Sequence, residues 1–498
     1  MANVTNAATP NSRMASKDFA APALPVNRTA GGWIASQLIG WGAFVAFLFV
    51  LSAVFLGVVR LFASFDQNKL RPGGIGEGLG NILMLVLVFV MITATLLTMA
   101  DRKWSALMQD RVGPNRARLP IPGLRDKALA GIPHIVADVL KMLFKEDFLS
   151  TGAAKEKLLF NLGPLLSFAP AFMLFAIVPV GPEVTVFGKR IALQVARLDW
   201  GILYVFALAS IGVFGTALAG WSSDNKFALL GGLRASAQLV SYEVTLGLTL
   251  VGTFIAFGTL RLDEMVVLQG AAEQAWRAGG ADPTLLFGWL PQWGIFLQPL
   301  GCVLFMVAAM AEIKRPPFDA PEGESEIIGY FIEYSGLKSG LFLIAEYVET
   351  VVVAGIITAM FLGGWHLPWV EPALASALLD VSREHGLAML AVFQVFTFIV
   401  KTLAVIWVFF LVRWSFPRFR YDQVMRLGWK MMLPVSLANV VVTAGVFLWG
   451  GRPAMAVVGL LELAALAFFI AFSDHKPAAE PAHGHGAHDA HPAPAASH

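Results

Sequence analysis

The chain has 498 residues, of which 57% are hydrophobic and 14% are charged, and its mean hydropathy is +0.68. Soluble domains carry about 25% charged residues. Apolar runs recur along nearly the whole chain, which excludes an ordinary soluble protein and indicates a polytopic membrane protein. The net charge of +2 gives no sign of nucleic-acid binding. The single cysteine, Cys302, excludes an internal disulfide and any cysteine-ligated cluster held by this chain alone.

Ten segments are apolar and long enough to cross a membrane, and all are expected to be helical because a single strand cannot satisfy its backbone in lipid. We therefore predict an all-α polytopic membrane protein. The expected spans are about 33–62, 81–100, 158–180, 200–221, 236–258, 293–312, 340–362, 388–412, 432–450 and 453–472.

Positive charge predicts the orientation of these spans. The two tails and the loops 101–157, 222–235, 313–339 and 413–431 carry 25 Lys and Arg, whereas the alternate loops carry 10. Loops rich in Lys and Arg stay in the cytoplasm. We expect a multi-pass protein of the bacterial cytoplasmic (inner) membrane, with both termini in the cytoplasm.

The two ends of the chain have the composition of disordered tails. Residues 1–30 are rich in Ala, Asn, Pro and Thr, and residues 474–498 hold six of the nine histidines among Ala and Pro. The histidines could bind a divalent metal loosely. A solvated tail is the favoured interpretation, and no metal site is expected elsewhere.

An amphipathic helix is predicted within the first long loop, at PHIVADVLKMLFKED (133–147). Its apolar residues recur at helical spacing, whereas Asp138, Lys141 and Lys145 lie on the other side. The apolar set is Ile135, Val136, Val139, Leu140, Leu143 and Phe144. Such a helix lies at the membrane boundary, either as a plain surface anchor or as part of a site.

The segment 312–338 is unusually acidic for a loop beside a membrane. Its carboxylates are Glu312, Asp319, Glu322, Glu324, Glu326 and Glu333. If they are dry, their repulsion raises some pKa values, so the loop would exchange protons near neutral pH. The alternative is an ordinary solvated charge run, although the interleaved aromatic residues and prolines favour packing.

Ionisable residues also stand inside the predicted spans, where they are costly and indicate an ion pathway. They are Glu243, Glu346, Glu349, Lys401 and Glu462. Lys401 lies in the middle of its span and could pair with one of the carboxylates. A purely structural buried pair is the alternative. The residues alone therefore indicate proton or cation handling.

Six motifs, in order, resemble the quinone-site membrane subunit of respiratory complex I. The family that the motifs resemble is the H-type membrane subunit of bacterial NADH:quinone oxidoreductase, the counterpart of mitochondrial subunit 1. The motifs are RK-x(5)-QDRVGPN (102–115), ADVLKMLFKED (137–147), GWSSDNKFALLGGLRASAQLVSYE (220–243), KRPPFDAPEGESE (314–326), EYSGLKSGLFLIAEY (333–347) and PRFRYDQVMRLGWKMMLP (417–434).

The resemblance implies an eight-helix membrane core at about 81–450. On this basis residues 31–80 would add one helix and a loop before the core, residues 451–473 would add one helix after it, and the count would be ten. The chain has no nucleotide or iron–sulfur motif of its own and no covalently bound cofactor is expected. NADH and the clusters would therefore belong to partners.

The resemblance also implies roles for particular residues. Those beside the quinone chamber would be Arg102, Lys103, Arg111, Asp138, Lys141, Glu146, Arg315 and Asp319. Those on a buried proton path would be Glu243, Glu312, Glu322, Glu324, Glu326, Glu333, Glu346 and Lys401.

The chain departs from the family pattern at several positions. Asp101 stands where the family usually has Glu, about ten residues are inserted at 116–130, and His134 replaces a Gln in front of the amphipathic helix. The segment between Glu326 and Glu333 is one residue short, which puts the orientation of Glu333 in question. Glu349 stands where Asn is common and would add a titrating group.

The resemblance implies a subunit of a proton-translocating NADH:quinone oxidoreductase. Its substrate would be ubiquinone or menaquinone, and its partners would be cluster-bearing hydrophilic subunits, small membrane subunits and antiporter-like subunits. Two alternatives remain at this point: the membrane anchor of an energy-converting hydrogenase, and a stand-alone cation/proton antiporter.

Overall fold

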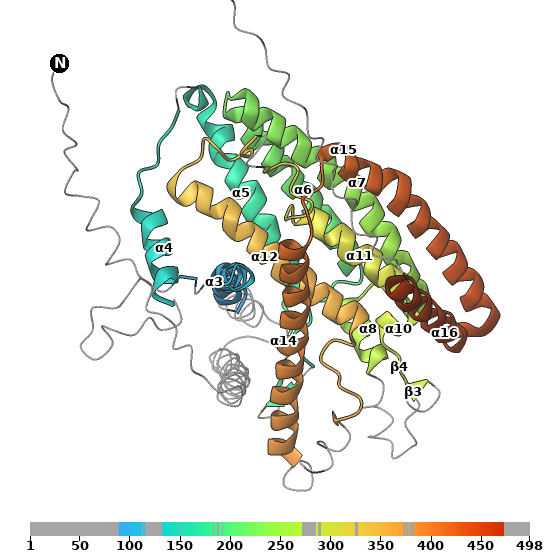
Figure 1. Ribbon diagram of the computed structural model, residues 1–498. Coiled ribbons are helices and arrows are strands. Elements are labelled where there is room, and N and C mark those ends of the chain that lie inside the picture. Colours follow the sequence, from blue (N-terminus) through green and yellow to red (C-terminus); the bar gives the residue numbers. More distant parts are fainter. Residues whose placement is uncertain are drawn as a thin grey trace, which may run out of the picture.

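The computed structural model describes residues 89–472, except 112, 115–131, 151, 183, 187–188, 192, 271–284, 287–289, 324–326, 372–373, 375–376 and 378–382. Long helices dominate this part of the chain (Figure 1). The helical stretches that are long and apolar enough to cross a membrane are Ala153–Ile177, Gly201–Ser222, Lys226–Phe257, Gly336–Phe361, Met389–Ser415 and Tyr421–Phe468. The predicted all-α polytopic class is confirmed. The count of ten spans stays a prediction, since the span 33–62 and both tails lie outside the described residues.

The helices, in chain order, are α3 (Met91–Met108), α4 (Ile132–Phe144), α5 (Lys157–Leu174), α6 (Gly201–Ser222), α7 (Lys226–Phe257), α8 (Leu262–Gln269), α10 (Gly294–Leu297), α11 (Pro299–Glu312), α12 (Gly336–Phe361), α14 (Arg383–Ser415), α15 (Tyr421–Arg426) and α16 (Leu433–Phe472). A π-helical segment, Leu427–Met432, joins α15 to α16. The described strands form two short antiparallel pairs, β1 (Val184–Val186) with β2 (Lys189–Ile191) and β3 (Leu285–Leu286) with β4 (Leu290–Pro291).

Two predicted boundaries are wrong, and local polar contacts explain both. The span expected to end at 100 continues as α3 to Met108. Its polar end is tolerated because Asp101 is satisfied inside the protein. The loop expected at 222–235 is largely helix, since α7 begins at Lys226. The Asn225 side chain accepts a hydrogen bond from the Phe227 N–H at 3.0 Å and so caps the helix.

Two predicted spans contain breaks that hydropathy does not reveal. The span 293–312 is interrupted at Gln298, between α10 and α11. The Gln298 amide there donates to Thr443 Oγ1 at 2.7 Å and accepts from Asn439 Nδ2 at 3.1 Å. The spans 432–450 and 453–472 together form α16, which breaks at Gly451, where φ is +63°. Irregular backbone at membrane depth is tolerated only where its polar groups are satisfied. The Gln298 N–H donates to the Gly294 carbonyl at 2.8 Å, and the Gln298 carbonyl accepts from the Cys302 N–H at 3.0 Å.

Small residues let the central helices approach closely. A Cβ on Gly220 of α6 would lie 2.7 Å from the Ala228 carbonyl oxygen and 3.1 Å from the Gly232 Cα of α7. A Cβ on Gly215 would collide with the Ser167 hydroxyl of α5. Such contacts are typical of membrane helices, which gain little from the hydrophobic effect and pack through small side chains.

The bundle of described helices has two ends, one marked by α4 and the other by α8. The α4 end comprises α4, residues 313–323 and 327–335, and the start of α12, where the Ser335 hydroxyl donates to the Glu146 carbonyl at 3.0 Å. The α8 end comprises α8, residues 362–371 and the end of α12, where Gln269 Nε2 donates to the Ala359 carbonyl at 2.8 Å.

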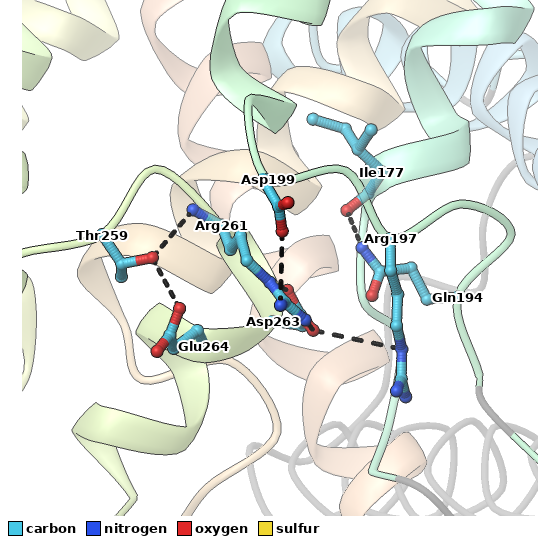
Figure 2. Close-up of polar contacts among 8 residues, drawn as sticks. All are labelled: Ile177, Gln194, Arg197, Asp199, Thr259, Arg261, Asp263 and Glu264. Atoms are coloured by element: carbon cyan, nitrogen blue, oxygen red, sulfur yellow. Dashed lines mark hydrogen bonds and ion pairs between the residues drawn. The ribbon is translucent and has the colours of Figure 1, made fainter.

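Ion pairs connect the segment that precedes α6 to the segment that precedes α8 and to the first turn of α8 (Figure 2). Arg261 pairs with Asp263 at 2.8 Å and with Asp199 at 3.5 Å. Glu264 accepts a hydrogen bond from the Thr259 hydroxyl at 2.7 Å. Asp199 is exposed and its pair with Arg261 contributes little stability, whereas the Arg261–Asp263 pair is part-buried.

The predicted amphipathic helix is confirmed as α4. Its apolar side is uncovered, with Val136 54%, Leu143 57% and Phe144 84% exposed. Its polar side is attached to α3 through an ion pair between Arg102 and Asp138, 2.5 Å apart. The helix therefore presents an apolar stripe outward, as a helix at a lipid or partner boundary does.

Gln238 links α7 to the α4 end, and its loss should weaken the fold. Its fully buried Nε2 donates to the Ala311 and Phe318 carbonyls, both at 2.8 Å. Gln238→Leu would leave the buried Phe318 carbonyl without its donor, at about 1–3 kcal/mol, and would leave the Ala311 carbonyl with the Lys314 N–H at 3.3 Å. We expect a lower thermal midpoint of the purified complex and less assembled complex in the membrane. Val240→Leu, at an exposed position of the same helix, is the control; equal midpoints for the two variants would contradict the assignment.

Candidate functional site

Asp101 is the hub of a buried polar network at the α4 end. It is 4% exposed, although it lies on a helix of apolar character. Its carboxylate accepts hydrogen bonds from Arg413 Nη1, from the Trp414 indole at 3.0 Å and from the Tyr347 hydroxyl at 3.0 Å. Arg315 Nη1 lies 3.6 Å from the same carboxylate. One acidic side chain therefore connects α3, α12, α14 and the loop after α11.

A cavity of about 600 Å³ opens beside this hub. Its lining includes the cations Arg102, Arg111 and Arg413, the Asp101 carboxylate, and Tyr347. This volume is in the range of pockets that bind small organic molecules. The surplus of arginines suits a ligand that carries or gains negative charge.

The structure separates the predicted chamber residues into groups. Arg102 and Arg111 line the cavity. Asp138 is not part of the lining but forms an ion pair with Arg102. Lys103 is half-buried on α3 outside the lining, whereas Lys141 and Glu146 are exposed.

Arg315 and Asp319, the other two predicted chamber residues, lie in a second layer behind the cavity. The Arg315 guanidinium stacks 3.8 Å from the centre of the Tyr347 ring, and its Nη2 lies 3.7 Å from a Glu346 oxygen. Arg315 is therefore placed between Asp101, which lines the cavity, and Glu346, which does not. Asp319 pairs with Arg418 at 2.7 Å.

This second layer holds more acid than base. Burial, with the negative charges of Glu346 and Asp319, raises the pKa of Glu322 well above its usual range. Burial also raises the pKa of Asp319 to about 7, although Arg418 opposes the shift. Burial alone would lower the pKa of Lys314, but the surrounding carboxylates, Glu349 first among them, raise it. Glu322 therefore holds a proton at neutral pH, and Asp319 titrates close to it.

Deeper in the bundle, a small cavity of about 60 Å³ connects further carboxylates. Its lining includes Glu243 of α7, Glu312 of α11 and Glu349 of α12, together with Lys314. Lys314 Nζ lies 3.7 Å from Glu349, and the Ser210 hydroxyl donates to Glu243. The predicted path residues Glu243, Glu312, Glu322 and Glu346 are thus gathered in one region, which Glu349 joins.

Other predicted path residues lie elsewhere. Glu333 accepts a hydrogen bond from Asn225 Nδ2 at 2.7 Å, at the start of α7. Among the described residues, Lys401 does not pair with the intramembrane carboxylates that were considered as its partners, Glu243, Glu346, Glu349 and Glu462. Its ammonium donates to the Leu362, Gly364 and His366 carbonyls at the α8 end, because the chain leaves α12 there and exposes those oxygens. Glu324 and Glu326 lie outside the described residues.

Several residues of the site were not predicted as such, namely Asp101 in its role as hub, Lys314, Tyr347, Arg413 and Trp414. Lys314 and Arg413 are cations at the ends of apolar helices, a signal that could have suggested buried partners. The contacts of Asp101 with Tyr347 and Arg413 join residues 246 and 312 positions apart, which no local pattern indicates.

These features define a polytopic α-helical membrane protein with a polar cavity next to a buried ionic network. The sequence profile of the NADH dehydrogenase family matches residues 80–444. The first of two H-type membrane subunits of NADH-quinone oxidoreductase in Geobacter metallireducens is 39% identical over 367 residues, which is 74% of this chain and 95% of the relative.

Two further relatives that carry the same subunit name show similar identity and coverage. The second H-type protein of Geobacter sulfurreducens is 38% identical over 371 residues, and the first H-type protein of Cytophaga hutchinsonii is 38% identical over 368 residues. Each alignment covers 74% of this chain and 96% of the relative. The chain therefore belongs to the NADH dehydrogenase family, among the H-type membrane subunits of the complex I class, and the resemblance inferred from the motifs is confirmed.

The raised pKa of Asp319 predicts a pH dependence of stability. The ordinary value of 3.8 applies to the unfolded chain and about 7 to the folded protein. The folded state therefore binds the proton more tightly, and this stability is complete below 3.8 and is lost as the pH rises through 7. Asp319→Asn removes the titration.

Thermal midpoints of the purified complex, measured across that range, test this expectation. As the pH rises toward 7, the free energy of unfolding of the wild type should fall by up to a few kcal/mol relative to that of the variant. Above pH 7 the difference between the two proteins should stay constant. Asp422→Asn, at an exposed position of α15, is the control. Parallel curves for wild type and Asp319→Asn would contradict the assignment.

Proposed function

We propose that this chain forms the quinone chamber of a proton-translocating NADH:quinone oxidoreductase and couples quinone reduction to the protonation of buried carboxylates. The observation that carries the proposal is the position of Arg315 between Asp101 of the cavity and Glu346 of the carboxylate network. Both distances exceed that of a tight hydrogen bond, so a change in charge on either side alters the balance between the two contacts.

The cavity supports a quinone as the ligand. A quinone headgroup has two carbonyl oxygens that gain negative charge on reduction, and arginines and the Tyr347 hydroxyl can donate hydrogen bonds to such oxygens. The apolar side of α4 is uncovered at the same end, which favours entry from a lipid surface. The electrons would come from a cluster held by a partner protein of the complex.

The route of charge proposed here begins at the chamber. Negative charge on the quinone draws Arg315 toward Asp101 and weakens its interaction with Glu346. Glu322, which faces the negative charge of Glu346, then binds a proton more readily, since two carboxylates sharing one site cannot both stay ionised. Lys314 and Glu349 connect this step to Glu312 and Glu243 around the deeper cavity. From there the change would pass to antiporter-like partner subunits.

The proposed setting follows from charge and from the relatives. The predicted cytoplasmic loops include the α4 end, so the chamber would face the cytoplasm of a bacterial cell, with both termini on the same side. The relatives are named as subunits of NADH-quinone oxidoreductase, which favours this assembly over a hydrogenase anchor. Partner subunits would cover the exposed polar groups of the α4 end.

Filling the cavity tests the quinone assignment. Ser105 lines the cavity and is 7% exposed, so Ser105→Trp should occupy the space of the headgroup. We expect NADH oxidation by a soluble artificial acceptor to persist. The rate of quinone reduction should fall about tenfold or more, which corresponds to an activation free energy higher by about 1.4 kcal/mol.

The matched control is Leu107→Trp on the same helix, at a position 66% exposed and outside the lining. Quinone reduction at the wild-type rate in Ser105→Trp, with the complex assembled, would remove the cavity from the proposal.

Arg315→Lys tests the coupling step. Lysine keeps the positive charge, but its single ammonium cannot contact both carboxylates as the guanidinium fork does. We expect fewer protons translocated per quinone reduced in membrane vesicles, with assembly retained. Arg426→Lys, on the surface helix α15, is the control. An unchanged ratio in Arg315→Lys would show that the bridge is structural only.

A further inference from the structure

A second buried titratable cluster lies at the α8 end, opposite the carboxylate network. It consists of Lys401 of α14 with His366 and Glu371, which follow α12. His366 is 2% and Glu371 7% exposed. α12 joins the two regions, because it carries Glu346 and Glu349 near its middle and ends beside the Lys401 ammonium. The quinone-coupling steps described above do not use this cluster.

Hydrogen bonds link the three residues in a row, since Lys401 contacts the His366 backbone and the His366 ring contacts Glu371. Lys401 Nζ donates to the carbonyls of Leu362 at 2.6 Å, Gly364 at 3.1 Å and His366 at 2.7 Å. The His366 ring binds Glu371 through Nδ1 at 3.0 Å. Gln394 Nε2 donates to the other Glu371 oxygen at 3.3 Å. Among the described residues, Glu371 is the charged group whose field acts on Lys401.

Tryptophans place this cluster at the edge of the membrane. The Lys401 ammonium lies 4.3 Å from the centre of the Trp293 ring, and Trp293 packs edge-to-face against Trp369 at 5.4 Å. Trp369 is 55% exposed. Because tryptophans gather at the boundary between lipid and water, the cluster lies just inside that boundary.

The buried pair has a charge state suited to proton release. Burial alone would raise the pKa of Glu371, but the hydrogen bond and charge of His366 lower it below its usual range. Glu371 thus stays ionised next to the His366 ring. A hydrogen bond between the Thr402 and Thr358 hydroxyls, at 3.3 Å, extends the polar groups from Lys401 toward the middle of the bundle.

A structural role alone would not require these residue types. A cation at the end of a helix stabilises the last carbonyls, and an arginine does this as well as a lysine. What the lysine, the imidazole and the carboxylate share is the ability to gain and lose a proton, and here all three meet at one boundary of the membrane.

We propose that Lys401, His366 and Glu371 form a proton-release site on the outer side of the membrane. The Lys401 ammonium passes a proton to the His366 imidazole, which leaves a neutral amine and an imidazolium beside the Glu371 carboxylate. The imidazolium then gives the proton to outer water, and Lys401 takes up the next proton from the bundle. No oxidant or further reactant is needed. This inference rests on the proposed function.

The test uses membrane vesicles that contain the whole complex and compares proton translocation at matched rates of quinone reduction. Lys401→Arg keeps the positive charge but does not release a proton. Glu371→Gln keeps the size and hydrogen bonds of the side chain without its charge. We expect both variants to reduce quinone and to lose proton translocation, and Glu371→Asp, which keeps a titrating carboxyl, to regain it.

The control is Glu264→Gln, a carboxylate on the same side that contacts Thr259 instead of this cluster (Figure 2). Proton translocation at the wild-type ratio in Lys401→Arg or in Glu371→Gln would overturn the inference. If Glu371→Gln fails to assemble, Lys401→Arg and His366→Asn decide the outcome by the same ratio. A failure of the proposed function would instead appear in the wild type, as quinone reduction without proton translocation.

Discussion

The burial of the Asp101 carboxylate is the constraint on which the rest of the α4 end depends. Two arginines, Arg413 and Arg315, are partly or fully withdrawn from water around it, and a buried cation without a partner costs several kcal/mol. The Tyr347 hydroxyl and the Trp414 indole complete the set of donors. Since these groups come from α3, α12, α14 and the loop after α11, their mutual satisfaction fixes the relative positions of the elements that enclose the cavity.

The same constraint leaves the network behind the cavity short of positive charge. Once Arg413 is paired with Asp101, the buried carboxylates face Lys314, a shared Arg315 and, at Asp319, the part-exposed Arg418. Electroneutrality in a region of low dielectric then requires some carboxyls to hold protons, as the raised pKa values of Asp319 and Glu322 show. Proton binding is therefore a consequence of how the charges are distributed, and it responds to any further charge placed in the cavity.

The sequence could predict the membrane class, the amphipathic α4 and the acidic loop, since each depends on a local pattern of apolar and charged residues. It could not predict that α3 continues to Met108 or that a span breaks at Gln298, because those depend on partners far along the chain. Lys401 shows the same limit: its position inside an apolar span suggested a carboxylate partner, whereas backbone oxygens freed at the end of α12 bind it. Hydropathy reports which residues avoid water but not which polar groups meet.

The last segment of α16 illustrates how residues beyond the family match, which ends at 444, become part of the core. Arg452 Nε donates to the Ala256 carbonyl near the end of α7, at 2.9 Å, and a Glu462 oxygen accepts from the Leu300 N–H near the start of α11, at 3.4 Å. Each charge thus satisfies a backbone group at a helix terminus of the favourable sign. In lipid those groups have no water to bind, so a helix that supplies both partners stabilises α7 and the broken α10–α11 segment at once. The positions of Arg452 and Glu462 in this segment are therefore explained by the backbone ends that they meet.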